Sequence, residues 1–220
     1  ESIVDSRIAD LMRRNNPTVG LAAHLGQVDV RITARATTEG RAAEMLDDVA
    51  TDVRTRLGDF VYAEGDISLE TVVVAALKDA GYRLALVETN TGGEIAGRLQ
   101  AAPGGDQIIR RAQVVSSPVE IGSGGPANLV SSGAAEWAAR QLLSDAQEDG
   151  ATLGFALCGT MDPAAGPYGA YRGETFVGIA TGHNALSMRI DTGGTDELAR
   201  RWVGNGALNW LRLWLAGSAN

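Results

Sequence analysis

The chain has 220 residues, of which 45% are hydrophobic, and it carries a formal net charge of −8 at pH 7. A chain of this length folds as one large domain or two small ones. The acidic balance argues against broad electrostatic attraction to nucleic acid or anionic membranes, because such binding depends on clustered Lys and Arg. The single cysteine excludes an internal disulfide framework. No apolar run approaches the roughly 20 residues that span a bilayer.

The first 65 residues predict a small α+β domain in which helices cover one face of a short sheet. Residues 28–36 alternate apolar and polar side chains, which is the pattern of a strand exposed on one side. In residues 41–57, apolar positions recur at three- and four-residue spacing, as in an amphipathic helix. The predicted elements are a helix over 5–14, strands over 18–25 and 28–36, a helix over 41–57 and a strand over 60–63.

Residues 66–220 predict a second, layered α/β domain. Helical and strand patterns alternate along this part of the chain, which is typical of a sheet covered by helices. Ligands of such sheets bind at loops beyond the carboxyl ends of the strands. The predicted helices cover 69–80, 92–101, 132–147 and 196–215, and the predicted strands cover 83–87, 113–116, 152–157, 175–180 and 186–191.

A polar, glycine-rich turn follows the strand predicted over residues 83–87. It reads Glu88-Thr89-Asn90-Thr91-Gly92-Gly93 and leads into a helix. Backbone N–H groups at a helix start favour anions such as phosphate, and glycines let a ligand approach the main chain closely. The turn therefore predicts a pocket for a phosphorylated small molecule, although many turns of this composition only change the direction of the chain.

A second loop at a strand end carries Cys158, Gly159 and Thr160, and we expect it to lie near the first. Within the Gly-, Pro- and Ala-rich segment that follows, Arg172 is the predicted phosphate-binding residue. A thiol is more nucleophilic than a hydroxyl, but it needs a partner that lowers its pKa. The two histidines lie far from Cys158 in sequence, so a buried and unreactive thiol is the favoured interpretation.

Four acidic residues stand at the ends of predicted strands, namely Glu88, Glu120, Asp162 and Glu174. If they gathered at one site, they could hold magnesium or divide acid and base roles between them. Their spacing is not diagnostic, and acidic side chains at loop ends are usually solvated. No metal site and no cofactor are therefore predicted.

Several motifs occur in the order and at the approximate spacing found in CinA proteins. The matching segments are Glu88-Thr89-Asn90-Thr91-Gly92-Gly93, Ala102-Pro103-Gly104, Val130-Ser131, Cys158-Gly159-Thr160-Met161-Asp162-Pro163 and Gly173-Glu174-Thr175-Phe176. Upstream, Asn16-Pro17-Thr18-Val19 and residues 27–33 resemble the KH-like linker domain of the same family. The resemblance implies a KH-like α+β domain over 1–65 and a nicotinamide mononucleotide deamidase-like α/β domain over 66–220.

The resemblance also implies a serine nucleophile, a lysine base, a nearby tyrosine and an arginine late in the domain. Thr89 stands at the serine position, Ser116 at the tyrosine and Ile121 at the lysine. The family's Gly-Asp-Arg corresponds to Gly193-Gly194-Thr195, which contains no arginine. Isoleucine cannot accept a proton, and loss of a general base typically lowers a rate by ~10²–10⁴-fold. Thr89 is therefore expected to be a degenerate nucleophile position.

Three hypotheses follow from these residues. The leading one is a catalytically degenerate, nucleotide-binding or structural module whose ligand is a pyridine nucleotide or another phosphorylated small molecule. The second is an active amidohydrolase that converts nicotinamide mononucleotide to nicotinic acid mononucleotide and ammonia. The third is an architectural oligomerisation domain for an upstream pyrophosphatase domain that these residues do not include. The predicted ligand-binding residues are Thr91, Gly92, Gly93, Ser116, Cys158, Gly159, Thr160 and Arg172.

The resemblance also bears on partners and compartment. Nucleic-acid-binding KH domains use a Gly-X-X-Gly loop, and residues 1–65 contain none, so no nucleic-acid binding is expected. Trp202, Trp210 and Trp214 lie in the last predicted helix, where tryptophans anchor a core or a subunit contact. The family suggests a homo-oligomer in the cytoplasm, without attachment to a membrane.

Overall fold

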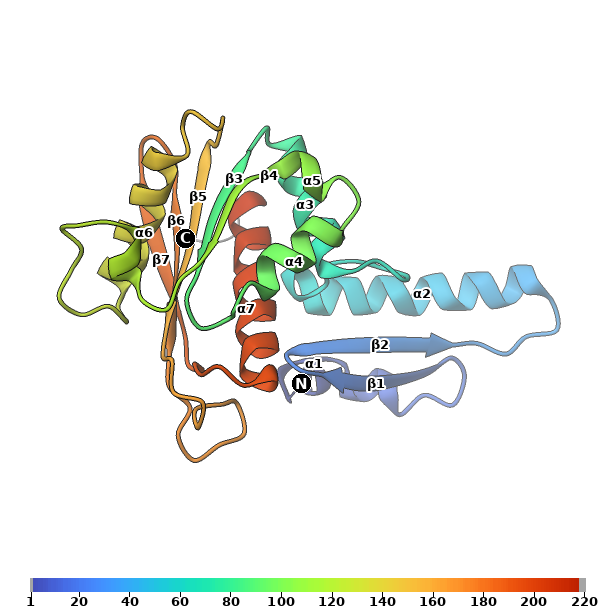
Figure 1. Cartoon of the computed structure of the whole chain (residues 1–220). Helices are drawn as coiled ribbons and strands as arrows, with labels where there is room; N and C mark the ends of the chain where they lie inside the picture. Colours follow the sequence, from blue (N-terminus) through green and yellow to red (C-terminus); the bar gives the residue numbers. More distant parts are fainter. Residues whose placement is uncertain (1, 218–220) are drawn as a thin grey trace. The chain divides into compact units, whose positions relative to one another are not determined.

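The computed structural model describes residues 2–217, and the chain divides into two units at residues 64 and 65 (Figure 1). In the N-terminal unit, β1 and β2 form an antiparallel hairpin in which Val19 pairs with Ile32. Apolar side chains of the hairpin and of both helices form the core of this unit. Its elements are α1 (Ser2–Met12), β1 (Thr18–His24), β2 (Gln27–Thr33), α2 (Glu39–Leu57) and the 3-10 helix η1 (Gly58–Phe60).

The strand predicted over residues 60–63 is wrong. The helix α2 ends at Leu57, and its C-cap Gly58 turns the chain with a positive φ of 53°. Val61 N–H then donates to the Gly58 carbonyl at 3.0 Å. That bond closes a 3-10 turn. No described strand pairs with residues 61–63, and an apolar run needs a hydrogen-bonded neighbour to become a strand.

The C-terminal unit contains a five-stranded sheet in the order β4-β3-β5-β6-β7. The strand β3 is parallel to β4 and β5, whereas β6 is antiparallel to both β5 and β7. The elements before β5 are α3 (Leu69–Asp79), β3 (Leu84–Glu88), α4 (Glu94–Ala101), α5 (Gly105–Ile108), β4 (Ile109–Val114), η2 (Pro118–Ile121) and α6 (Ser132–Asp145). The remaining elements are β5 (Leu153–Gly159), β6 (Thr175–Ala180), β7 (Ala185–Ile190) and α7 (Glu197–Leu215).

The strand β4 begins four residues earlier than the predicted strand over 113–116, and it ends at Val114. It is an edge strand, so only one of its sides is paired and alternate side chains stay exposed. Arg110 and Arg111 lie in this strand and weaken its apolar pattern. The sequence signal therefore starts too late.

Helices cover both faces of this sheet, which makes the unit three-layered. Figure 1 shows α6 on one side and α4 and α7 on the other. Along β3, Ala85 and Val87 pack under α6, so the alternating residues Leu84, Leu86 and Glu88 face the opposite layer. The predicted layered α/β fold is confirmed.

Small residues bring α6 unusually close to the strands. The helix contributes Ala134, Ala135, Ala138 and Ala139 to the core cluster. Opposite them, a Cβ added at Gly154 would lie 2.1 Å from the Ala139 carbonyl oxygen, and one added at Gly178 would lie 2.2 Å from that of Ala135. The backbone of α6 thus rests directly on two glycines of β5 and β6.

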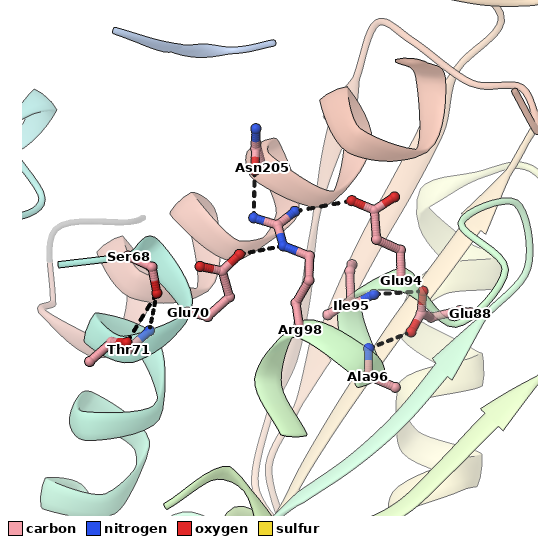
Figure 2. A network of polar contacts seen from close by, with 9 residues as sticks. All are labelled: Ser68, Glu70, Thr71, Glu88, Glu94, Ile95, Ala96, Arg98 and Asn205. Atoms are coloured by element: carbon pink, nitrogen blue, oxygen red, sulfur yellow. Dashed lines mark hydrogen bonds and ion pairs between the residues drawn. The ribbon is translucent and has the colours of Figure 1, made fainter. Parts of the chain in front are cut away.

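On the other face, Arg98 of α4 joins three helices. Its Nε pairs with Glu70 of α3, its Nη1 lies 3.3 Å from a Glu94 oxygen, and its Nη2 donates to Asn205 Oδ1 of α7 at 2.6 Å (Figure 2). Burial raises the pKa of Glu94, and the charges of Arg98 and Arg201 offset that rise only in part. Every nitrogen of the Arg98 guanidinium therefore has a partner within the protein.

Candidate functional site

The ends of three strands meet at one edge of the sheet. Glu88 of β3 pairs with Leu157 of β5, and Gly159 pairs with Thr175 at the start of β6. The prediction that the loops after β3 and β5 lie together is therefore confirmed: Thr89 N–H donates to the Leu157 carbonyl at 3.2 Å. We call this edge the site edge.

The Thr89 hydroxyl is occupied by the protein itself. Its side chain is 3% exposed. The Oγ1 atom donates to the Leu157 carbonyl at 3.0 Å and accepts from Gly159 N–H at 3.0 Å, and Asn90 Oδ1 lies 3.4 Å away. All of these partners are backbone or amide groups. The hydroxyl thus ties β3 to β5, and none of its partners can act as a base.

The usual bases lie at the other end of the strands. The chain has a single lysine, Lys78, which is exposed in the last turn of α3, before β3 begins. His183 lies in the turn between β6 and β7, and β6 runs away from the site edge toward that turn. Within the C-terminal unit, neither a lysine nor a histidine is placed to activate Thr89.

Asn90 extends this internal hydrogen-bond network. Its Nδ2 donates to Thr175 Oγ1 at 2.9 Å, and Thr175 Oγ1 donates to the Thr192 carbonyl at 2.9 Å. The three side chains are buried, and a Cβ at Gly159 would lie only 2.2 Å from Asn90 Oδ1. A series of hydrogen bonds thus joins the end of β3, β6 and the segment after β7. It gives these buried polar groups the partners that such groups require.

Glu88 is fully buried and accepts three hydrogen bonds at the start of α4, of which Figure 2 shows the two from Ile95 and Ala96. Its Oε1 accepts from Ala96 N–H at 2.8 Å, and its Oε2 accepts from Ile95 N–H at 3.2 Å and from Thr91 Oγ1 at 2.5 Å. The anion at this helix start is therefore a side chain of the protein. This corrects the expectation that these N–H groups and the Thr91 hydroxyl are free for a phosphate.

The four acidic residues do not gather at one site. Glu120 accepts from Ser116, Asp162 accepts from Ala164 N–H, and Glu174 pairs with Arg189, each with its own partner. Across residues 2–217, no group of three or more His, Cys, Asp or Glu side chains lies close enough to hold a metal ion. The expectation that acidic residues at strand ends are solvated is wrong for Glu88, which faces inward.

The positions that the resemblance aligned with tyrosine and lysine have other roles. Ser116 is exposed and donates to Glu120 Oε1 at 2.7 Å. Ile121 is buried in the core cluster beneath α6. Neither residue is a hydrogen-bond partner of Thr89.

Cys158 is buried in the core rather than at the site edge. Its side chain packs with the alanines of α6 and is 0% exposed. Burial raises the pKa of the thiol to about 12. A ligand at the site edge cannot reach this side chain, which corrects its place among the predicted ligand-binding residues.

We expect the Cys158 thiol to react with iodoacetamide roughly 100-fold or more slowly in the folded protein than in concentrated urea, because the thiolate is the reactive form and is disfavoured by burial. The chain has no other cysteine, so mass spectrometry of the intact protein reports this site alone. Rapid stoichiometric labelling of the folded protein would show an accessible thiol.

The loop between β5 and β6 is held at the site edge by Thr160. Its hydroxyl accepts from Glu174 N–H at 3.1 Å, and its carbonyl accepts from Gly194 N–H at 2.7 Å. Arg172 is exposed, and its carbonyl accepts from Gly193 N–H at 2.7 Å. The structure therefore brings Thr160 and Arg172 to the same edge as Gly92 and Gly93, and the Arg172 side chain extends into solvent there.

Arg200 is the residue at this edge that sequence reasoning missed. It lies one turn into α7, four residues after the N-cap Asp196. A Cβ at Gly92 would lie 2.8 Å from its Nη1 and 3.0 Å from its Cζ, so the guanidinium rests against the glycine turn. The sequence does predict that the last helix begins soon after a strand, which places its first turn near the end of the sheet. It does not show which of the two adjacent arginines, Arg200 or Arg201, contacts the glycine turn.

A cavity of about 280 Å³ lies elsewhere, between α6 and the β6–β7 turn, where Arg140 and His183 line it. It is at the far end of the strands from Thr89 and is not the predicted site. No helix within residues 2–217 is both long enough and apolar enough to cross a membrane.

Comparison with known proteins gives consistent matches. The family model described as "Damage-inducible protein CinA KH domain" matches residues 1–63, and "CinA C-terminal domain" matches residues 66–215. A CinA-like protein of Dictyoglomus thermophilum is 28% identical over 218 residues, covering 96% of this chain and 53% of that protein. A CinA-like protein of Prochlorococcus marinus is 30% identical over 205 residues, covering 88% of this chain and 46% of that protein.

Solved structures agree on the fold. A crystal structure of a competence-damaged protein (CinA) superfamily member from Klebsiella pneumoniae superposes with a TM-score of 0.58 at 24% identity, covering 68% of this chain and 96% of that one. The chain spans about half the length of the curated relatives that it matches. Since the two family models together cover nearly all of its residues, the chain belongs to the CinA family.

Proposed function

We propose that the C-terminal unit binds a phosphorylated small molecule, such as a pyridine nucleotide, at the site edge and does not hydrolyse it. The observation that carries this proposal is the double hydrogen bond of Thr89 Oγ1 with Leu157 and Gly159. A serine or threonine nucleophile must pass its proton to an adjacent base. Here the proton is donated to a backbone carbonyl, which cannot take it up.

The glycine turn supports the binding part of the proposal. Gly92 is exposed and has a φ of +65°, and Gly93 has a φ of +89°, conformations that glycine adopts without strain. Because these glycines have no side chains, other groups can approach the backbone of the turn closely, as the Arg200 guanidinium does at Gly92. Thr160 and Arg172 lie at the same edge on the neighbouring loop. An exposed glycine turn with polar residues at the same edge of the sheet suits a small polar ligand.

An ammonia-release assay with nicotinamide mononucleotide tests the catalytic part. We expect no ammonia above background from the wild type or from Thr89→Ser, because restoring the family's serine does not restore a base. An active amidohydrolase assayed in parallel controls for the sensitivity of the assay. Turnover by the wild type that Thr89→Val abolishes would show that Thr89 is a working nucleophile and would refute the proposal.

Thermal unfolding with the same nucleotide tests the binding part. A ligand that binds only the folded state stabilises it by about 2.7 kcal/mol at 100 times its dissociation constant, so the midpoint should rise with nucleotide concentration. Absence of both turnover and stabilisation across pyridine and adenine nucleotides would favour an architectural role instead.

A further inference from the structure

We infer that Arg200 and the Gly92 turn form an anion subsite that binds the phosphate group of a small molecule. The inference deepens the proposed function and rests on it for the identity of the ligand. Three features of the site edge carry it: the position of the guanidinium, the lack of a hydrogen-bond partner for its Nε among the described residues, and the occupation of several other anion-binding groups by the protein.

The Arg200 guanidinium can occupy its position because residue 92 has no side chain. The guanidinium of Arg200 lies where even a methyl group on Gly92 would come within 2.8 Å of Nη1 and 3.0 Å of Cζ. Gly92 is exposed, whereas Arg200 is half-buried. The arginine thus lies against an exposed backbone turn at the site edge, and a ligand from solvent can bind at that turn.

The hydrogen-bonding state of Arg200 differs from that of the other arginine in this layer. Arg98 has Glu70, Glu94 and Asn205 as partners. By contrast, the Nε of Arg200 is buried and has no hydrogen-bond partner within the described residues. A guanidinium has five donors and no acceptor, and a buried donor without a partner costs free energy. Because protein atoms cover this nitrogen, an external acceptor reaches it only when the Arg200 side chain moves, and an acceptor that does so relieves the cost.

Several other polar groups at the site edge are already hydrogen-bonded within the protein. Glu88 already takes the N–H groups of Ile95 and Ala96, and the Thr89 hydroxyl is shared by two backbone groups. These groups are therefore already taken within the protein, and a side chain such as Arg200 can hold an incoming anion in their place. The planar fork of an arginine matches phosphate and carboxylate oxygens with two parallel hydrogen bonds. A phosphomonoester is the acceptor that unites this chemistry with the proposed nucleotide.

Titration calorimetry with three probes tests the subsite. The probes are nicotinamide mononucleotide, nicotinamide riboside, which lacks the phosphate, and inorganic pyrophosphate. For the wild type, we expect the mononucleotide to bind more tightly than the riboside. In Arg200→Gln, affinity for both phosphate-bearing probes should fall by about 10- to 100-fold, the effect of losing charge-assisted hydrogen bonds. The difference between mononucleotide and riboside should shrink accordingly.

Arg201→Gln is the matched control. It removes the same charge from the next position of α7, where the side chain is exposed. Its affinities should stay within about twofold of the wild type, because a general electrostatic effect is screened by salt. If Arg200→Gln does not fold, Gly92→Ala replaces it: this change keeps the arginine but displaces its guanidinium from the turn, and it should weaken phosphate binding similarly.

The outcomes separate the two proposals. Equal loss of affinity in Arg200→Gln and Arg201→Gln, or no loss in either, would refute the subsite while nucleotide binding stands. Arg200-dependent binding of pyrophosphate, without binding of the mononucleotide, would support the subsite and refute the proposed ligand. If the wild type binds none of the three probes, both proposals are wrong.

Discussion

Replacing Gly178 by alanine is expected to destabilise the C-terminal unit by about 3 kcal/mol or more, although the change adds one methyl group. The new Cβ would lie 2.2 Å from the carbonyl oxygen and 2.4 Å from the carbonyl carbon of Ala135 in α6. A shift of the helix away from Gly178 would also open a gap at Gly154 of β5, which packs equally closely against Ala139. Urea unfolding, followed by tryptophan fluorescence, measures the loss.

Gly182→Ala is the control for this prediction. Gly182 lies in the β6–β7 turn, and an added Cβ would meet no atom within 4 Å. Its unfolding free energy should stay within about 0.5 kcal/mol of the wild type or rise slightly, since alanine reduces the freedom of the unfolded chain. If the two variants were equally stable, the close packing of α6 on the sheet would be wrong.

The elements that sequence predicts best are those whose pattern is local. The strand β6 has the predicted bounds 175–180, and α7 begins one residue after its predicted start, where Asp196 caps it by accepting from Ala199 N–H. Helix caps and apolar periodicity depend on residues that are close together in the sequence. The edge strand β4 and the false strand over 60–63 depend instead on whether a partner strand is available, which no short segment records.

The candidate site shows the same difference between features that follow from local sequence and features that depend on distant segments. Sequence correctly predicts that the loops after β3 and β5 converge, because parallel strands end at the same edge of a sheet. It does not reveal that Glu88 and Thr89 turn inward to bond with the protein's own backbone. Nor does it reveal Arg200, which reaches the turn from a helix more than 100 residues later in the sequence. Both depend on tertiary contacts between distant segments.

Glu88→Gln is expected to cost about 3 kcal/mol of stability, the second large effect that the structure predicts. The two carboxylate oxygens accept from three donors, Thr91 Oγ1 and the N–H groups of Ile95 and Ala96. A glutamine keeps one acceptor oxygen and places an NH₂ group against the remaining donor. The variant also removes a negative charge buried at the positive end of α4. Chemical denaturation gives the change in unfolding free energy.

Glu197→Gln tests whether burial is the reason for the large loss of stability expected for Glu88→Gln. Glu197 also stands in the first turn of a helix, α7, but it is exposed, so its loss should cost no more than about 0.5 kcal/mol. A much larger loss for Glu88→Gln would support the conclusion that α4 receives its anion from within the protein and leaves an incoming phosphate to Arg200. Equal losses would mean that the N–H groups of Ile95 and Ala96 do not depend on Glu88, and these groups would then compete with Arg200 as the place where a ligand phosphate binds.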